Sequence, residues 1–197
     1  TETAAISHYI LPALSAYESY DNGMAYGFPG VFMQMRHPVV KPEGEQLEAA
    51  EIFTRLADAL GLVPEIPESL QQAADSGDRL RFGAELMTFV GENPGAVRSM
   101  QYVLAKTLGR SLGSVNQASL WGRMATLPPW AQEKAARAGF TPGPTMGDDM
   151  FQAIFDAPGG LIVGSVDPDQ WDHFKVISTA DGRINLDVPE MLEWLEE

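Results

Sequence analysis

The chain has 197 residues, 45% of them hydrophobic and none of them cysteine, a composition typical of a globular protein with one sizeable core. The absence of cysteine excludes disulfides, thiolate-bound zinc, iron–sulfur clusters and cysteine nucleophiles from these residues. Acidic residues outnumber lysine and arginine by 27 to 13 and give a net charge of −14, so we expect neither nucleic acid nor a membrane as partner.

The first 42 residues alternate short apolar segments with turns. Residues 1–8 predict a short helix with a threonine cap. Residues 9–11, which Pro12 follows, predict a brief strand. The glycines, the proline and the Asp-Asn-Gly triplet between residues 15 and 30 predict a loop, and residues 31–36 then resume as an extended segment.

From residue 45 onward, the apolar residues recur at the spacing of helices. This spacing predicts helices over residues 45–60, 69–75, 79–90, 96–108, 114–124, 130–138 and 146–155. Gly61 supplies a stop for the first of them, and Pro129 stands near the first turn of the sixth, where a missing N–H costs nothing. Scattered methionines are expected to fill gaps in the core.

The last quarter of the sequence changes character. Residues 161–166 predict a buried strand, and residues 175–187 predict a hairpin around Asp181-Gly182, since this pair allows the positive φ angles of a tight turn. We expect these two segments to form one small antiparallel sheet, followed by a final helix from Pro189. The whole sequence therefore predicts an α+β fold that is mainly α-helical, with short β-strands near both ends.

Three passages follow a pattern known from one enzyme family. The first is T-E-T-A at residues 1–4 with S-H-Y-I-L-P-A at 7–13, followed by Glu18. The second is R-H-P-V-V-K-P at 36–42, followed by E-I-F-T-R-L-A-D-A-L-G at 51–61, and the third is D-G-R-I-N-L-D at 181–187 with P-E-M-L after it. Together they resemble the molybdopterin oxidoreductases of the dimethyl-sulfoxide-reductase type.

The resemblance implies a parent enzyme much larger than this chain. Such a parent holds molybdenum or tungsten between two molybdopterin guanine dinucleotides and performs two-electron redox chemistry on a small substrate. Its metal ligand, and in many members an iron–sulfur cluster, comes from an upstream region, while a downstream domain closes over the pterins. The chain itself would then hold no cofactor or metal and would be inactive alone, with the remaining domains of the parent as its partners.

The same resemblance divides the chain into three parts of a larger α/β enzyme. Residues 1–42 would be the remnant of a Rossmann-like half-domain on the pterin side. Residues 43–158 would form a helical subdomain, and residues 159–197 a small β-hairpin with a terminal helix. The parts are expectations from the family pattern and from the change in apolar spacing.

The loop after Pro12 departs from the family, because the G-T-x-x-N-x-E-G-R-x-Q phrase of many members is absent. Contacts with the parent's cofactor would come from Glu18, Asp21 and Asn22. Each has a plainer interpretation: Glu18 could order the loop by accepting backbone N–H groups, and the other two are common turn residues. We predict no catalytic residue and no metal ligand, since the three histidines are widely separated in the sequence.

A different class of function fits the same residues, namely a free-standing acidic helical interaction module without a cofactor. Of the two alternatives, we expect that the chain is a fragment of the larger enzyme. It starts at Thr1 within a family phrase, and it ends in two glutamates at the negative pole of a predicted helix. The gene would then extend on both sides. The sequence does not name the substrate, the metal or the location, for which the cytoplasm is slightly favoured.

Overall fold

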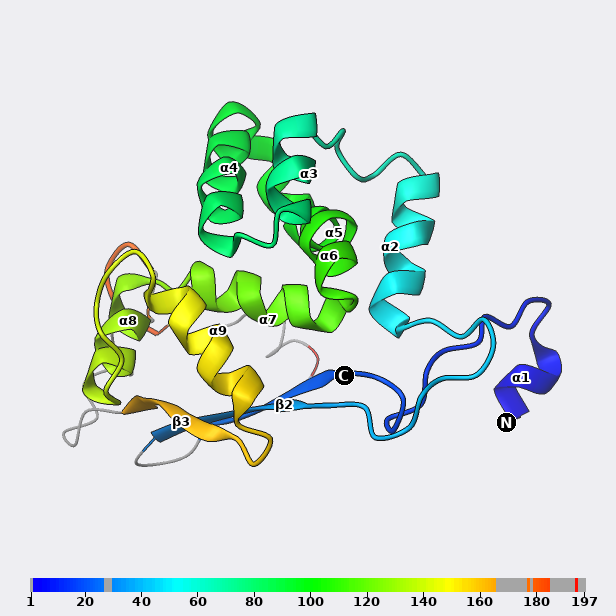
Figure 1. The fold of residues 1–197 in the computed structure, drawn as a ribbon, viewed down its shortest axis with the longest axis horizontal. Coiled ribbons are helices and arrows are strands. Elements are labelled where there is room, and N and C mark those ends of the chain that lie inside the picture. Colours follow the sequence, from blue (N-terminus) through cyan, green and yellow to red (C-terminus); the bar gives the residue numbers. More distant parts are fainter. Residues whose placement is uncertain (1, 27–29, 166–176, 178, 185–193, 195–197) are drawn as a thin grey trace.

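The computed structural model describes residues 2–26, 30–165, 177, 179–184 and 194. In this part of the chain, most helices lie above a small three-stranded sheet (Figure 1). The predicted α+β class, mainly helical with short strands near both ends, is confirmed.

The strands are ordered β1–β2–β3 in the sheet. β1 (Asp21–Tyr26) and β2 (Gly30–Arg36) pair antiparallel, with Asp21 opposite Arg36. β3 (Leu161–Ser165) pairs antiparallel with the other side of β2. The sheet therefore joins the first and third predicted parts of the chain, and the extended segments predicted for β2 and β3 are confirmed.

Two predictions for the amino-terminal segment are wrong. Residues 9–11 form no strand, because no described strand runs beside them; only Ala13, further on, makes an isolated parallel bridge with Leu47. The loop predicted over residues 15–30 contains β1. Turn-forming residues take up a strand there because β2 supplies a hydrogen-bonding partner, which local preferences do not reveal.

The antiparallel sheet predicted between residues 161–166 and 175–187 falls partly on residues that are not described, and β3 pairs with β2 on one of its sides. Residues 175, 176, 178 and 185–187, which make up most of the two predicted hairpin strands, lie outside the described residues, so this sheet stays a prediction. The turn itself is present: the Gly182 N–H donates to Thr179 O (3.0 Å), and Gly182 has a φ of +65°. The predicted final helix from Pro189 also lies outside the described residues.

Every described stretch that was predicted to be helical contains a helix. The bounds are α1 (Glu2–Ile6), α2 (Ala49–Ala59), α3 (Glu68–Asp75), α4 (Arg79–Glu92), α7 (Val115–Ala125), α8 (Pro129–Arg137) and α9 (Met146–Asp156). The helix predicted over 96–108 is divided into a 3-10 helix η1 (Pro94–Ser99), α5 (Met100–Leu104), a π-helical turn η2 (Ala105–Gly109) and α6 (Arg110–Leu112). Within the described residues, no helix is long and apolar enough to cross a bilayer.

The core lies around α7, which crosses between the sheet on one side and helices α3, α4 and α5 on the other (Figure 1). Seven of its eleven residues are buried. Trp121 of α7 packs edge-on against Phe82 of α4, with ring centroids 5.4 Å apart. From the sheet, Met33 and Met35 enter the core at the two-residue spacing of one strand face. Methionine does fill the core at these positions, whereas Met87 is exposed.

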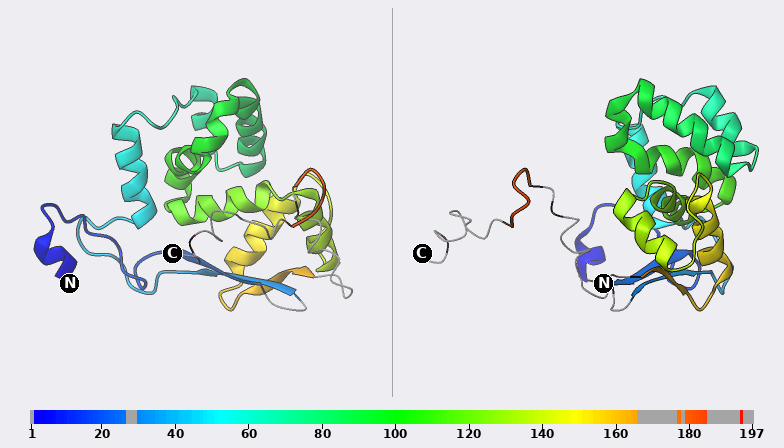
Figure 2. Two further views of the ribbon diagram at one scale, coloured as in Figure 1. Left: turned by 180° about the vertical axis from the view of Figure 1, so that it is seen from behind. Right: turned by 90° about the vertical axis from the view of Figure 1, so that its left-hand side faces the viewer.

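The apolar stripe that predicts α2 does not face the core. α2 buries Thr54 and Ala57, while Phe53, Leu56 and Leu60 are exposed. Both Figure 1 and the left view of Figure 2 place α2 at the same end of the molecule as α1. The amphipathic pattern therefore predicts the helix correctly. The side of α2 that the described residues bury is the one next to the apolar stripe and not the stripe itself.

Candidate functional site

Glu18 orders the turn before β1. Its Oε2 accepts a hydrogen bond from the backbone N–H of Ser15 (2.9 Å). The hydrogen bonds from the backbone and then from the side chain of Ser15 lower the pKa of the Glu18 carboxyl. This is the plainer of the two interpretations of Glu18, and its contact with a cofactor in a parent enzyme stays a prediction.

Asp21 and Asn22 begin strand β1, so their interpretation as turn residues is wrong. Asp21 forms an ion pair with Arg36 across the two strands, with Oδ2 and Nη2 3.2 Å apart. Asn22 pairs with Met35 in the same register. Asp21 and Asn22 thus begin the edge strand, and Glu18 lies in the turn before it. None of the three lines the two cavities beside Arg79 and Glu48.

The described residues do not fit a metal centre of their own. No group of three or more histidine, aspartate or glutamate side chains converges among them. The Nε2–H of His37 donates to Phe155 O (2.9 Å), and the rings of His37, Tyr20 and Phe155 pack against one another. These contacts give His37 a structural role in the described part of the chain. No molybdenum or tungsten ligand set exists in this part of the chain, and no reaction step through such a metal follows from it.

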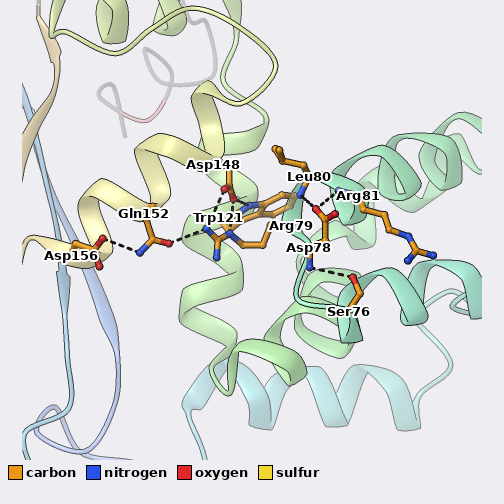
Figure 3. A network of polar contacts seen from close by, with 9 residues as sticks. All are labelled: Ser76, Asp78, Arg79, Leu80, Arg81, Trp121, Asp148, Gln152 and Asp156. Atoms are coloured by element: carbon orange, nitrogen blue, oxygen red, sulfur yellow. Dashed lines mark hydrogen bonds and ion pairs between the residues drawn. The ribbon is translucent and has the colours of Figure 1, made fainter.

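The most extensive polar cluster joins three helices around one carboxylate (Figure 3). Arg79, the first residue of α4, binds Asp148 of α9 through two contacts, Nε to Oδ1 (2.6 Å) and Nη2 to Oδ2 (3.1 Å). The indole N–H of Trp121 in α7 donates to the same Oδ1 (2.9 Å). Arg79 Nη2 also donates to Gln152, which in turn donates to Asp156 (2.9 Å each).

This cluster is a structural clamp and not a reacting centre. Both Asp148 oxygens already accept hydrogen bonds, and the Arg79 guanidinium also lies 5.1 Å from the centroid of the Phe151 ring. The side chains of Arg79 and Asp148 are 23% and 20% exposed, so the pair is largely desolvated. Arg79 lies 69 residues from Asp148 in the chain, so local sequence patterns do not reveal the pair.

A cavity of about 490 Å³ lies beside the clamp. Its walls are mainly apolar and come from α4, from the second half of α7 and from residues 143–148. Thr126, Gln132 and Thr145, its uncharged polar side chains, each donate a hydrogen bond within the protein. The cavity offers packing surface but no group held ready for acid–base or nucleophilic chemistry.

A second carboxylate lies at the amino-terminal end of α7. Glu48, just ahead of α2, accepts hydrogen bonds from Ser114 Oγ (2.7 Å) and from the backbone N–H groups of Val115 (2.8 Å) and Asn116 (3.2 Å). The positive pole of a helix favours such an anion. Glu48 therefore fixes α2 to α7, beside a cavity of about 560 Å³ between α2 and residues 105–115.

Comparison with known proteins gives one partial match. No family model matches the chain, and no solved structure matches it. A stretch of 83 residues is 36% identical to a Bacillus subtilis (strain 168) protein named "Probable oxidoreductase YoaE". The stretch covers 40% of this chain and 12% of that protein, so the chain spans a small part of the relative. Part of the chain thus resembles a protein named as an oxidoreductase.

Proposed function

We propose that this chain is one segment of a larger molybdopterin-dependent oxidoreductase, and that it supplies a wall and a helical appendage. The observation that carries the proposal is the partial match to a longer oxidoreductase. The three family-like passages of the sequence support the molybdopterin type within the proposal. When bound in the parent, the cofactor supplies the two-electron redox centre.

The polar clusters of the chain support a structural role within such an enzyme. Asp148 and Glu48 each accept three hydrogen bonds from the protein itself, which leaves them as anchors between helices. Asp21 and Asn22 begin the edge strand of the sheet, and Glu18 lies in the turn before it. In the proposed parent, these three residues would orient or contact a pterin that neighbouring domains hold.

The test is the metal and pterin content of the protein encoded by the complete gene. Purified from cells that make the cofactor, it should contain stoichiometric molybdenum or tungsten by elemental analysis, and denaturation should release a fluorescent pterin after oxidation. The 197-residue chain purified from the same cells is the control and should contain neither. A complete gene product free of metal and pterin would contradict the proposal.

The alternative is a free-standing acidic interaction module. The net charge of −14 and the exposed side chains of α2 favour it over a stand-alone enzyme. A gene that encodes only these 197 residues would establish this alternative in place of the oxidoreductase.

A further inference from the structure

Large apolar side chains are exposed together at the amino-terminal end of the molecule. Two of them lie on α2, one is the residue directly after it, and three lie in the segment between α1 and β1. Their exposed fractions range from 46% to 90%. We name this set the amino-terminal apolar face, and its members are Tyr9, Ile10, Leu11, Phe53, Leu56 and Leu60.

Backbone contacts hold the two halves of this face in one region. The Leu14 N–H donates to Leu47 O (2.9 Å), and Ala13 forms a parallel bridge with Leu47. Residue 47 directly precedes the start of α2. The views in Figures 1 and 2 agree in placing this segment and α2 at one end of the molecule.

α2 cannot turn its apolar side inward without breaking contacts that fix its orientation. Asp58 pairs with Lys106 (Oδ1 to Nζ, 2.7 Å), and Glu48 binds the start of α7. Thr54 and Ala57 are already buried on the inner side. The exposure of Phe53, Leu56 and Leu60 is therefore built into the fold, as expected of a surface that another protein covers.

The charges around the face indicate what covers it. Between residues 2 and 65 there are nine acidic residues (Glu2, Glu18, Asp21, Glu43, Glu45, Glu48, Glu51, Asp58 and Glu65) and three basic ones (Arg36, Lys41 and Arg55). Arg36 and Arg55 pair with acids of the same region. Two basic residues from elsewhere in the chain, Lys106 and Arg110, also lie beside α2, where Lys106 pairs with Asp58. A second copy of the chain would set acid against acid, which disfavours contact.

We propose that the amino-terminal apolar face docks a further domain of the same polypeptide, one with an apolar centre and a rim of lysine and arginine. Such a centre and rim are the common anatomy of protein interfaces. The inference rests on the proposed function for the existence of that larger polypeptide. The matched relative is long enough for such domains, since the matched stretch is 12% of it.

The experiment is hydroxyl-radical labelling read by mass spectrometry, on the complete gene product and on the 197-residue chain. Each residue is compared with itself in the two samples. Labelling of Leu56 should be about fivefold lower in the complete protein than in the 197-residue chain. The reason is that a side chain that is half exposed in the 197-residue chain would lie at the centre of an interface. Leu80 of α4 is the matched control, because the two leucines are 46% and 49% exposed, and its labelling should not change.

A double substitution, Phe53→Ser with Leu56→Ser, tests the contact itself. Both side chains are exposed, so the 197-residue chain should keep its circular dichroism spectrum and its Tm. In the complete protein, labelling of Tyr9 should rise towards its level in the 197-residue chain.

Equal labelling of Leu56 in both unsubstituted samples would overturn the proposal, as would a dimer of the 197-residue chain at pH 7.5 that protects Leu56. Metal content is measured separately from labelling. If Leu56 is protected in a complete protein that contains no metal, the proposed cofactor is refuted and the proposed docking of the amino-terminal apolar face is supported.

Discussion

Asp148 is the residue on which helices α4, α7 and α9 converge (Figure 3). Replacing it with alanine leaves the Arg79 guanidinium and the Trp121 N–H without their acceptor in a largely desolvated place. We expect Asp148→Ala to lower the free energy of unfolding by about 2–3 kcal/mol. Urea denaturation followed by tryptophan fluorescence measures this loss.

Asp149 provides the matched control for this substitution. It lies in the same first turn of α9 but is exposed, and within the described residues its side chain accepts a hydrogen bond from Thr145, its neighbour four positions earlier. Asp149→Ala should cost less than about 1 kcal/mol, which is the usual size of a helix-dipole contribution. Equal losses for the two variants would show that the clamp adds nothing beyond the dipole.

The titration of Glu18 gives a prediction at pH values below neutral. The hydrogen bonds from Ser15 lower the pKa of its carboxyl in the folded protein. A lowered folded pKa means that the contact stabilises the protein above the unfolded pKa and that this contribution is lost as the pH falls through the folded value. Carboxyl NMR shifts followed against pH should therefore place the pKa of Glu18 below its ordinary value.

Two variants separate the causes of that shift. Ser15→Ala removes the hydroxyl and keeps the backbone N–H, so the pKa of Glu18 should rise only part of the way. Glu18→Gln removes the titrating group, and the difference in stability from the original chain should shrink as the pH falls through the folded pKa. A pKa of Glu18 at or above its ordinary value would contradict the geometry of the turn.

Gly147 sets how closely two elements, α7 and α9, approach. A Cβ at this position would lie 2.5 Å from Met124 O and 2.7 Å from Ala125 Cα, both in the backbone of α7. Backbone cannot move aside as a flexible side chain can, so we expect Gly147→Ala to lower the free energy of unfolding by about 1–3 kcal/mol. Thermal and urea unfolding followed by circular dichroism measure the loss.

Gly91 is the control glycine for this helix contact. It also lies within a helix, and nothing is found within 4 Å of where its Cβ would be. Gly91→Ala should raise the free energy of unfolding by about 0.5 kcal/mol, because alanine is the better helix former. If both alanine variants were stabilised, the two helices would not be in the close contact that the structure shows.

The elements show how far sequence alone can go. Apolar spacing predicts α2 to α9 because that signal is local, and Gly61 and Pro129 mark helix ends through their own backbone geometry. β1 escapes prediction because its sequence is that of a turn and only its pairing with β2 makes it a strand. Which side of α2 is buried also depends on a partner helix, and sequence spacing does not contain that information.

In the candidate site, too, local contacts could be predicted from the sequence and tertiary contacts could not. The sequence singles out Glu18, and its contact with Ser15 spans only three residues. The Arg79–Asp148 pair spans 69 residues and the Glu48 contacts with residues 114–116 span 66 to 68, so both require the tertiary fold. Tertiary contacts of single charged residues leave no periodic trace in a sequence, which is why neither cluster could be predicted.

At the scale of the whole molecule, net charge opposes the association that the amino-terminal apolar face would otherwise favour. At pH 7 the charge is −14, and the sequence pI is about 4.5. We expect the 197-residue chain to be monomeric at pH 7.5 in low salt, and to associate as the pH approaches 5 or as salt screens the repulsion. Sedimentation velocity across pH and salt measures the transition.

Two pairs of charge-neutral substitutions determine whether this association uses the proposed face. Phe53→Ser with Leu60→Ser removes apolar area from α2, and Leu80→Ser with Met87→Ser removes it from α4, where both side chains are also exposed. Neither pair alters the charge, so repulsion is the same in both variants. The α2 pair should shift the onset of association to lower pH and higher salt, because less apolar surface is available to bury. A shift with the α4 pair alone would place self-association on the opposite end of the helical body.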